Sequence, residues 1–149
     1  RWAFVTSKYL AQISLYLLGF LLATVCGWLY TWILFAPANP LALLGVFAAV
    51  SGLLFAWLLP YVTITLVSSV LANSTSAAAG ISVAGAVVWM LAGNIPQIAP
   101  LMPSALIGWA NALGATPPPP SNPGALAMSL IFAVVGLVLA IGVFEKQEL

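Results

Sequence analysis

The residues that decide the fold are Leu126–Phe144, with the sequence LAMSLIFAVVGLVLAIGVF. They include twelve Leu, Ile, Val or Phe side chains and carry no charge. A helix needs roughly 20 apolar residues to cross about 30 Å of hydrocarbon. Each Leu, Ile, Val or Phe near the helix centre favours insertion by about 0.3–0.6 kcal/mol. We therefore predict a transmembrane helix over residues 126–144.

The composition extends this prediction to the whole chain. Of its 149 residues, 64% are hydrophobic and 3% are charged, whereas soluble domains carry about 25% charged residues. Water cannot solvate such a surface, so the expected surroundings are a lipid bilayer. Three basic residues are too few to neutralise the backbone phosphates of a nucleic acid, which excludes nucleic acid as a partner.

Three further spans precede the first one. Residues 9–35 are free of charge, and residues 77–93 are apolar and rich in small side chains such as Gly80 and Gly85. Small residues let helices approach closely in lipid, which makes this span, together with the Gly136–Ala140 pair, a candidate partner interface. Residues 41–72 are too long for one straight crossing.

Pro60 interrupts the long span and predicts a kink there, because proline lacks the helical N–H. Three hydroxyl residues follow it, and they either satisfy freed backbone groups or line a polar path through the membrane: Thr63, Thr65 and Ser68. The alternative is that each hydroxyl bonds to its own helix.

Residues 94–124, between the third and fourth spans, are of a different kind. Pro96 and Pro103 prevent a long helix, but Pro103 and Ser104 can open a short one that ends near Gly114. Three apolar side chains share one face of that helix: Leu106, Trp109 and Leu113. We predict an external re-entrant or interfacial helix. The fold class is therefore all-α: residues 1–149 form one polytopic membrane helical bundle of about four transmembrane helices plus this short helix.

The charges predict the orientation. Arg1 and Lys8 precede the first span, and Lys146 follows the last one. Four crossings place all three on one side, which the positive-inside rule makes cytoplasmic. We expect a multi-pass protein of the plasma (inner) membrane, with both ends of this chain in the cytoplasm and residues 94–124 outside.

The chain lacks several residue types that catalysis and metal binding need, and this limits its possible functions. It has no His, no Asp and one Cys, and its two Glu residues lie at the C-terminal end. This excludes common metal sites and a Ser-His-Asp triad. There is no P-loop motif for ATP, and the predicted spans carry no ionisable residue for ion pumping. We expect no cofactor and no enzymatic activity in this chain, so energy for work would come from a partner.

Three segments resemble the permease subunits of ABC-2 type transporters. The opening Arg1-Trp2-Ala3-Phe4-Val5 with Lys8 resembles the end of that family's cytoplasmic coupling segment. Residues 95–110, with Pro96, Pro103 and Trp109, are similar to its external re-entrant region. The ending Phe144-Glu145-Lys146-Gln147-Glu148-Leu149 resembles its C-terminal tail.

The resemblance covers the C-terminal two-thirds of a six-span permease, and it implies that an N-terminal portion precedes Arg1. It also implies a homo- or heterodimer of permease subunits that works, as an exporter, with cytoplasmic P-loop ATPase subunits. Arg1, Trp2, Phe4 and Lys8 would lie beside the ATPase. The resemblance does not indicate the substrate.

Other functions remain open. A complete four-span assembly or accessory subunit without an ATPase partner fits the uncharged spans. An intramembrane enzyme would need catalytic residues outside this chain. A channel or carrier for a neutral solute would use the hydroxyl residues after Pro60.

Overall fold

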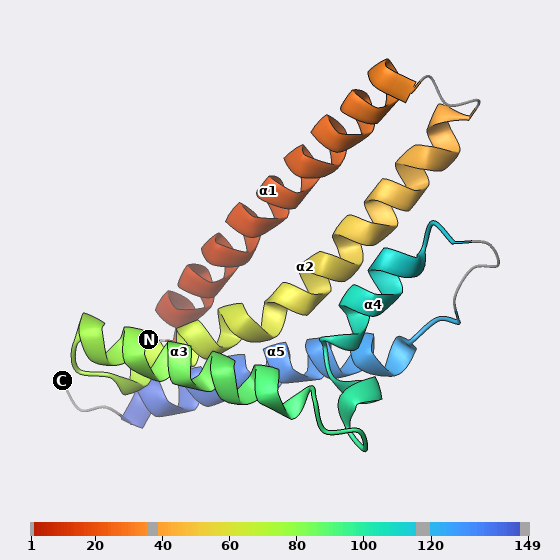
Figure 1. Ribbon diagram of the computed structural model, residues 1–149. Helices are drawn as coiled ribbons and strands as arrows, with labels where there is room; N and C mark the ends of the chain where they lie inside the picture. The colour runs from red at the N-terminus through yellow and green to blue at the C-terminus, as the bar shows by residue number, and fades with distance from the viewer. Residues whose placement is uncertain (1, 36–38, 116–119, 147–149) are drawn as a thin grey trace.

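The computed structural model describes residues 2–35, 39–115 and 120–146, and these ranges contain helices and no strands (Figure 1). The elements are α1 (Trp2–Phe35), α2 (Pro40–Leu71), α3 (Thr75–Ala92), η1 (Ala99–Leu101), α4 (Ala105–Ala112) and α5 (Pro123–Lys146). Helices α1, α2, α3 and α5 are long and apolar enough to cross a membrane. The predicted fold class, an all-α membrane bundle of four spans plus a short helix, is confirmed.

The first helix begins earlier than the predicted span. It starts at Trp2, seven residues before Tyr9. Thr6 Oγ1 donates to the Trp2 carbonyl at 2.8 Å and Ser7 Oγ to the Phe4 carbonyl at 3.0 Å. These hydroxyls bond within the helix and so do not end it. At about 1.5 Å per residue the 34 residues of α1 reach about 51 Å, which is longer than the hydrocarbon core.

Local capping explains where the other spans begin. Asn39 Oδ1 accepts from the Ala42 N–H at 3.2 Å before α2, and Ser74 Oγ accepts from the Ala77 N–H at 3.2 Å before α3. Asn122 caps α5 in the same way and also donates to the Pro100 carbonyl at 2.8 Å. Such side chains satisfy N–H groups that a helix start leaves free. The Asn122 bonds also tie the start of α5 to η1.

Helix α2 is the central element and continues through Pro60. It contacts α1, α3, α4 and α5. Figure 1 shows that α2 changes direction along its yellow part, which the colour bar assigns to the region around residue 60. The half before the bend packs on α4, the start of α5 and the later part of α1, and the half after it packs on α3, the end of α5 and the start of α1.

Helices α2 and α5 run in the same direction and make the closest contact in the bundle. Near the start of α5, Ala125 packs with Leu53 and Ala56 of α2. Near its end, Ala140 packs with Leu66 and Val70 of α2. Between these points a Cβ on Gly136 would overlap the Thr63 methyl group. The Gly136–Ala140 pair is therefore buried against α2 and does not form a partner interface as the sequence suggested.

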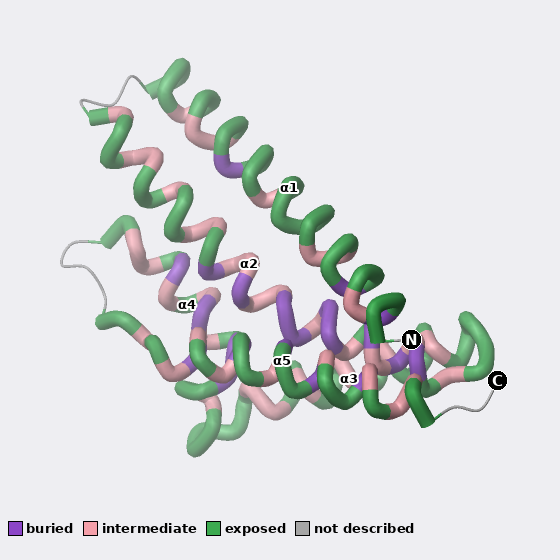
Figure 2. The backbone as a smooth tube through the Cα atoms, turned by 180° about the vertical axis from the view of Figure 1, so that it is seen from behind, coloured by how far each residue is buried: buried purple, intermediate pink, exposed green. Residues whose placement is uncertain are grey.

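The N-terminal end of α1 and the C-terminal end of α5 lie at the same end of the molecule (Figure 1). The rings of Phe4 and Phe144 stack there with centroids 6.2 Å apart. Figure 2 shows burial concentrated on α2 and on the facing side of α5, whereas α1 and α3 are mostly exposed. No residue of α3 is buried. An outer surface this apolar belongs in lipid, so the chain is a multi-pass membrane protein.

Candidate functional site

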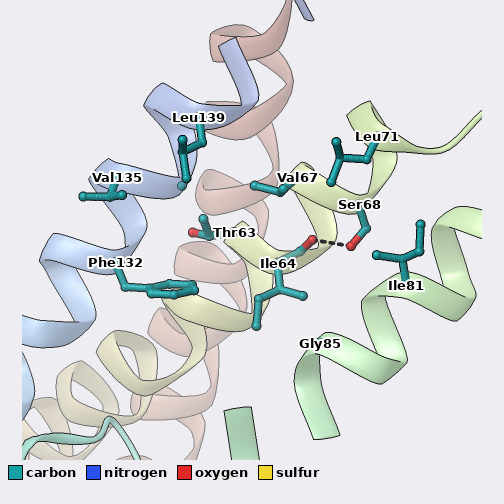
Figure 3. A pocket seen from close by; sticks show the side chains of 11 residues that line it. Thr63, Ile64, Val67, Ser68, Leu71, Ile81, Gly85, Phe132, Val135 and Leu139 are labelled. Carbon is teal, nitrogen blue, oxygen red and sulfur yellow. Dashed lines mark hydrogen bonds between the residues drawn. The ribbon is translucent and has the colours of Figure 1, made fainter. Parts of the chain in front are cut away.

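A cavity of about 240 Å³ lies between the second half of α2, α3 and α5 (Figure 3). Its walls are almost entirely aliphatic and aromatic, and two hydroxyl residues of α2 contribute to them, Thr63 and Ser68. Thr65 does not line it, because its side chain lies on the exposed side of α2. The three hydroxyls of the predicted polar path therefore do not come together.

The hydroxyls of α2 are bonded to the helix that carries them. Thr63 Oγ1 donates to the Leu59 carbonyl at 2.9 Å, and Ser68 Oγ donates to the Ile64 carbonyl at 2.7 Å. Thr65 Oγ1 donates to the Tyr61 carbonyl at 2.9 Å. This agrees with the alternative stated above, in which each hydroxyl bonds to its own helix.

The carbonyl that Pro60 leaves without a helical donor is that of Ala56, four residues earlier. The three hydroxyls donate to other carbonyls, so they do not satisfy the group that Pro60 frees. They also keep their protons turned into α2, which leaves the cavity without a free donor.

Tyr9 is a buried polar residue of this region that sequence reasoning did not single out. Its hydroxyl lies 2.8 Å from Thr63 Oγ1. Since Thr63 gives its one proton to the Leu59 carbonyl, the Tyr9 hydroxyl donates to Thr63. The available signal was a phenol inside an apolar span, because a buried tyrosine hydroxyl needs a partner.

A second polar contact joins α1 and α2 further along. Thr24 Oγ1 lies 2.6 Å from Ser51 Oγ and 2.7 Å from the Phe20 carbonyl. Trp28 Nε1 donates to the Pro40 carbonyl at 2.8 Å. Together with the Tyr9–Thr63 bond, these contacts hold the two longest helices together without any charge.

The segment predicted to couple to an ATPase is the first two turns of α1. Trp2 and Phe4 are exposed, and Phe4 stacks on Phe144. Lys8 lines a cavity of about 380 Å³ together with Ser69 and the start of α3. Arg1 lies outside the described residues. Lys8, Glu145 and Lys146 all sit at this end of the bundle, so the charged groups that the structure describes share one end.

The predicted external helix is α4, and its apolar face packs into the bundle. Leu106 is fully buried, and Trp109 and Leu113 pack around the same cluster, with Leu53 and Ala56 of α2 and Ala125 of α5. Pro103 is buried at the start of this helix, whereas Pro96 lies in the exposed turn after α3. Helix α4 thus reaches back between spans and does not lie flat on their surface.

Within the described ranges, no three His, Cys, Asp or Glu side chains come close enough to hold a metal ion. The polar groups brought together are hydroxyls, amides and indoles, which form hydrogen bonds between the helices.

Comparison with known proteins identifies no family for this chain. No family model, no curated protein and no solved structure matches it.

Proposed function

We propose that this chain is the membrane-spanning permease subunit of an ATP-driven transporter of the ABC-2 type, acting as an exporter. A separate cytoplasmic P-loop ATPase supplies the energy, and a second permease subunit completes the membrane core. The observation that carries the proposal is α4. A short helix that reaches back among the spans just before the last span is what the resemblance implies for the external region.

The arrangement of the termini adds support. The first two turns of α1 and the last turn of α5 are adjacent, and they carry the described charges. By the positive-inside rule this end faces the cytoplasm of a plasma (inner) membrane. An ATPase docked here would contact Trp2, Phe4 and Lys8 and could move α1 and α5 together. Coupling requires that nucleotide favours one of two conformations of these helices.

The test is to purify the full-length protein from its native membrane in mild detergent and to identify the proteins that co-elute. We expect a stoichiometric P-loop ATPase whose ATP hydrolysis is lost when its Walker lysine is substituted. In this chain, Trp2→Ala should lower recovery of the ATPase several-fold. Trp32→Ala is the control, because Trp32 is an exposed tryptophan (45%, against 61% for Trp2) near the opposite end of α1.

The alternative is a four-span assembly or accessory subunit without an ATPase. The exposed apolar sides of α1 and α3 favour it, since other membrane subunits could cover them. Purification that retains other membrane proteins but no ATPase, with Trp2→Ala and Trp32→Ala behaving alike, would support this alternative and contradict the transporter proposal.

A further inference from the structure

The cavity between α2, α3 and α5 opens to the outer surface of the bundle. Three of the side chains at its edge are about half exposed: Leu71 (50%), Val135 (49%) and Leu139 (57%). Figure 3 shows these side chains around the opening, with α3 on the opposite side of the gap from α5. Because four helices place this surface in lipid, the opening faces the hydrocarbon of the bilayer.

Phe132 of α5 lines the cavity and packs on Trp89 of α3. Their ring centroids are 4.2 Å apart, and Phe132 is part of the wall. From there the cavity extends past Gly85 and Ile81 of α3 toward the end of the bundle that holds the termini. The cavity is therefore a slot between α3 and α5 whose inner wall is α2.

The chemistry of the walls selects an apolar occupant. The hydroxyls of Thr63 and Ser68 donate to their own helix, so no free donor points into the space. Water needs two to four polar partners, and an apolar cavity of about 150 Å³ stays dry and binds benzene. A cavity of about 240 Å³ is larger, and a hydrocarbon chain from the bilayer fills it without exposing any polar group.

Measured along α5 from Lys146, the cavity reaches about the middle of the bilayer. Val135 lies 11 residues before Lys146, which is about 16 Å along the helix axis. Half of the hydrocarbon core is about 15 Å thick. If the charge of Lys146 marks the membrane interface, Val135 lies near the bilayer centre, where the end of an acyl chain is found, and Phe132 at about 21 Å lies just beyond it.

Lys146 also lies on the correct face of α5 to hold a headgroup. It follows Leu139 by seven residues, almost two complete turns, so the two side chains leave the helix on the same side, about 10 Å apart along the axis. Glu145 is turned about 120° away from Leu139. A positive charge therefore stands above the opening, and a long lysine side chain reaches toward the interface.

We propose that this cavity is a binding site for one phospholipid, with an acyl chain in the slot between α3 and α5 and the phosphate beside Lys146. The site depends only on the placement of the four spans in a bilayer. It does not depend on an ATPase partner, so it can fail or succeed separately from the transporter proposal.

The experiment uses the full-length protein in phosphatidylglycerol nanodiscs that contain a phosphatidylglycerol with a diazirine in the middle of one acyl chain. After irradiation, adducts are mapped by peptide mass spectrometry. We expect adducts at Ile81 and Leu139 to exceed those on the far side of α5 at least fivefold. Val135→Phe, which fills the slot, should lower the Ile81 adduct at least fivefold. Val138→Phe, on the outer side of the same helix, should not change it.

A second variant tests the headgroup without touching the packed core. Lys146→Gln should lower labelling by the phosphatidylglycerol probe about threefold or more, and leave labelling by a diacylglycerol with the same diazirine chain unchanged. Equal labelling of both sides of α5, or equal effects of Val135→Phe and Val138→Phe, would mean annular lipid only and overturn the site. A Val135→Phe variant that loses self-association while its labelling persists would assign the slot to a second copy and also overturn it.

Discussion

Tyr9 and Thr63 meet in the buried contact between α1 and α2, where their hydroxyl oxygens lie 2.8 Å apart. In membrane proteins such interhelical hydrogen bonds contribute about 0.6 kcal/mol on average and up to about 1.7 kcal/mol. We expect Tyr9→Phe and Thr63→Val to show a coupling energy in this range in a double-mutant cycle, measured by unfolding in mixed micelles. Tyr16→Phe is the control, because the Tyr16 side chain is 39% exposed. A coupling energy of zero would mean that the two hydroxyls are not bonded.

Gly136 is the residue at which α5 packs directly on Thr63 of α2. A Cβ there would overlap the Thr63 methyl group, which is fully buried and cannot move aside freely. We expect Gly136→Ala to destabilise the bundle by about 1–3 kcal/mol, the usual cost of overpacking. Gly142→Ala on the same helix meets no atom within 4 Å and should be neutral or slightly stabilising. Melting of both variants in detergent measures the difference, and equal melting temperatures would contradict the packing.

The sequence could place the hydroxyls of α2 inside a membrane helix but could not assign them to its faces. Helix α2 is apolar on every side, so no amphipathic pattern distinguishes Thr63, which is buried, from Thr65, which is exposed. The partner of Thr63 is Tyr9, 54 residues earlier in the chain. Local spacing contains no information about such a contact, which arises only when two spans pack.

At the scale of elements, the sequence predicted the four spans because each needs only length and hydropathy. The face of α4 was also predictable, since Leu106, Trp109 and Leu113 recur at helical spacing and pack into one cluster. The start of α1 was not predicted. The segment from Trp2 to Lys8 contains polar residues that suggest the end of a span, but their hydroxyls bond within the helix.

Pro60 lies between the part of α2 that packs on α4 and the part that packs on α3. Helix kinks sharper than about 20° are found mainly at proline and a few other features, and a 20° change moves the far end of the roughly 30 Å segment from Pro60 to Pro40 by about 10 Å. We expect Pro60→Ala to shift the distance between spin labels at Leu41 and Val138, which are both exposed, by several Å. Pro40→Ala, at the first position of α2, should leave it unchanged. The measurement is double electron–electron resonance on a Cys26→Ala background, and an unchanged distance would show that packing alone bends α2.

At the scale of the whole molecule, α2 divides the bundle into two parts. Figure 1 shows α1 and the first half of α2 extending away from α3 and α5. The parts meet in two buried clusters. One lies at the end that holds the termini and contains Val5, Tyr9, Val62, Leu66 and Ala140; the other lies near the start of α5 and contains Leu53, Ala56, Leu106, Ala110 and Ala125. Hydropathy cannot predict this division, because it depends on where α2 bends. The lipid slot between α3 and α5 could not be predicted either, since it is a gap between spans.

The arrangement of the ends makes a prediction about topology. The turn between α2 and α3 lies at the end that holds Lys8, whereas the turn after α3 lies at the other end, so Asn73 and Gln97 should face opposite sides of the membrane. Both residues are exposed. On a Cys26→Ala background, a membrane-impermeant maleimide should label Gln97→Cys but not Asn73→Cys in intact cells, and the reverse in inside-out vesicles. Lys146→Cys should be labelled from the same side as Asn73→Cys, because α5 ends beside the start of α1.

Labelling of Asn73→Cys and Gln97→Cys from the same side would mean that α3 does not cross the bilayer. Labelling of Lys146→Cys from the side of Gln97 would contradict the four-span bundle, and a uniformly reversed pattern would keep the bundle and overturn only the cytoplasmic placement of its ends.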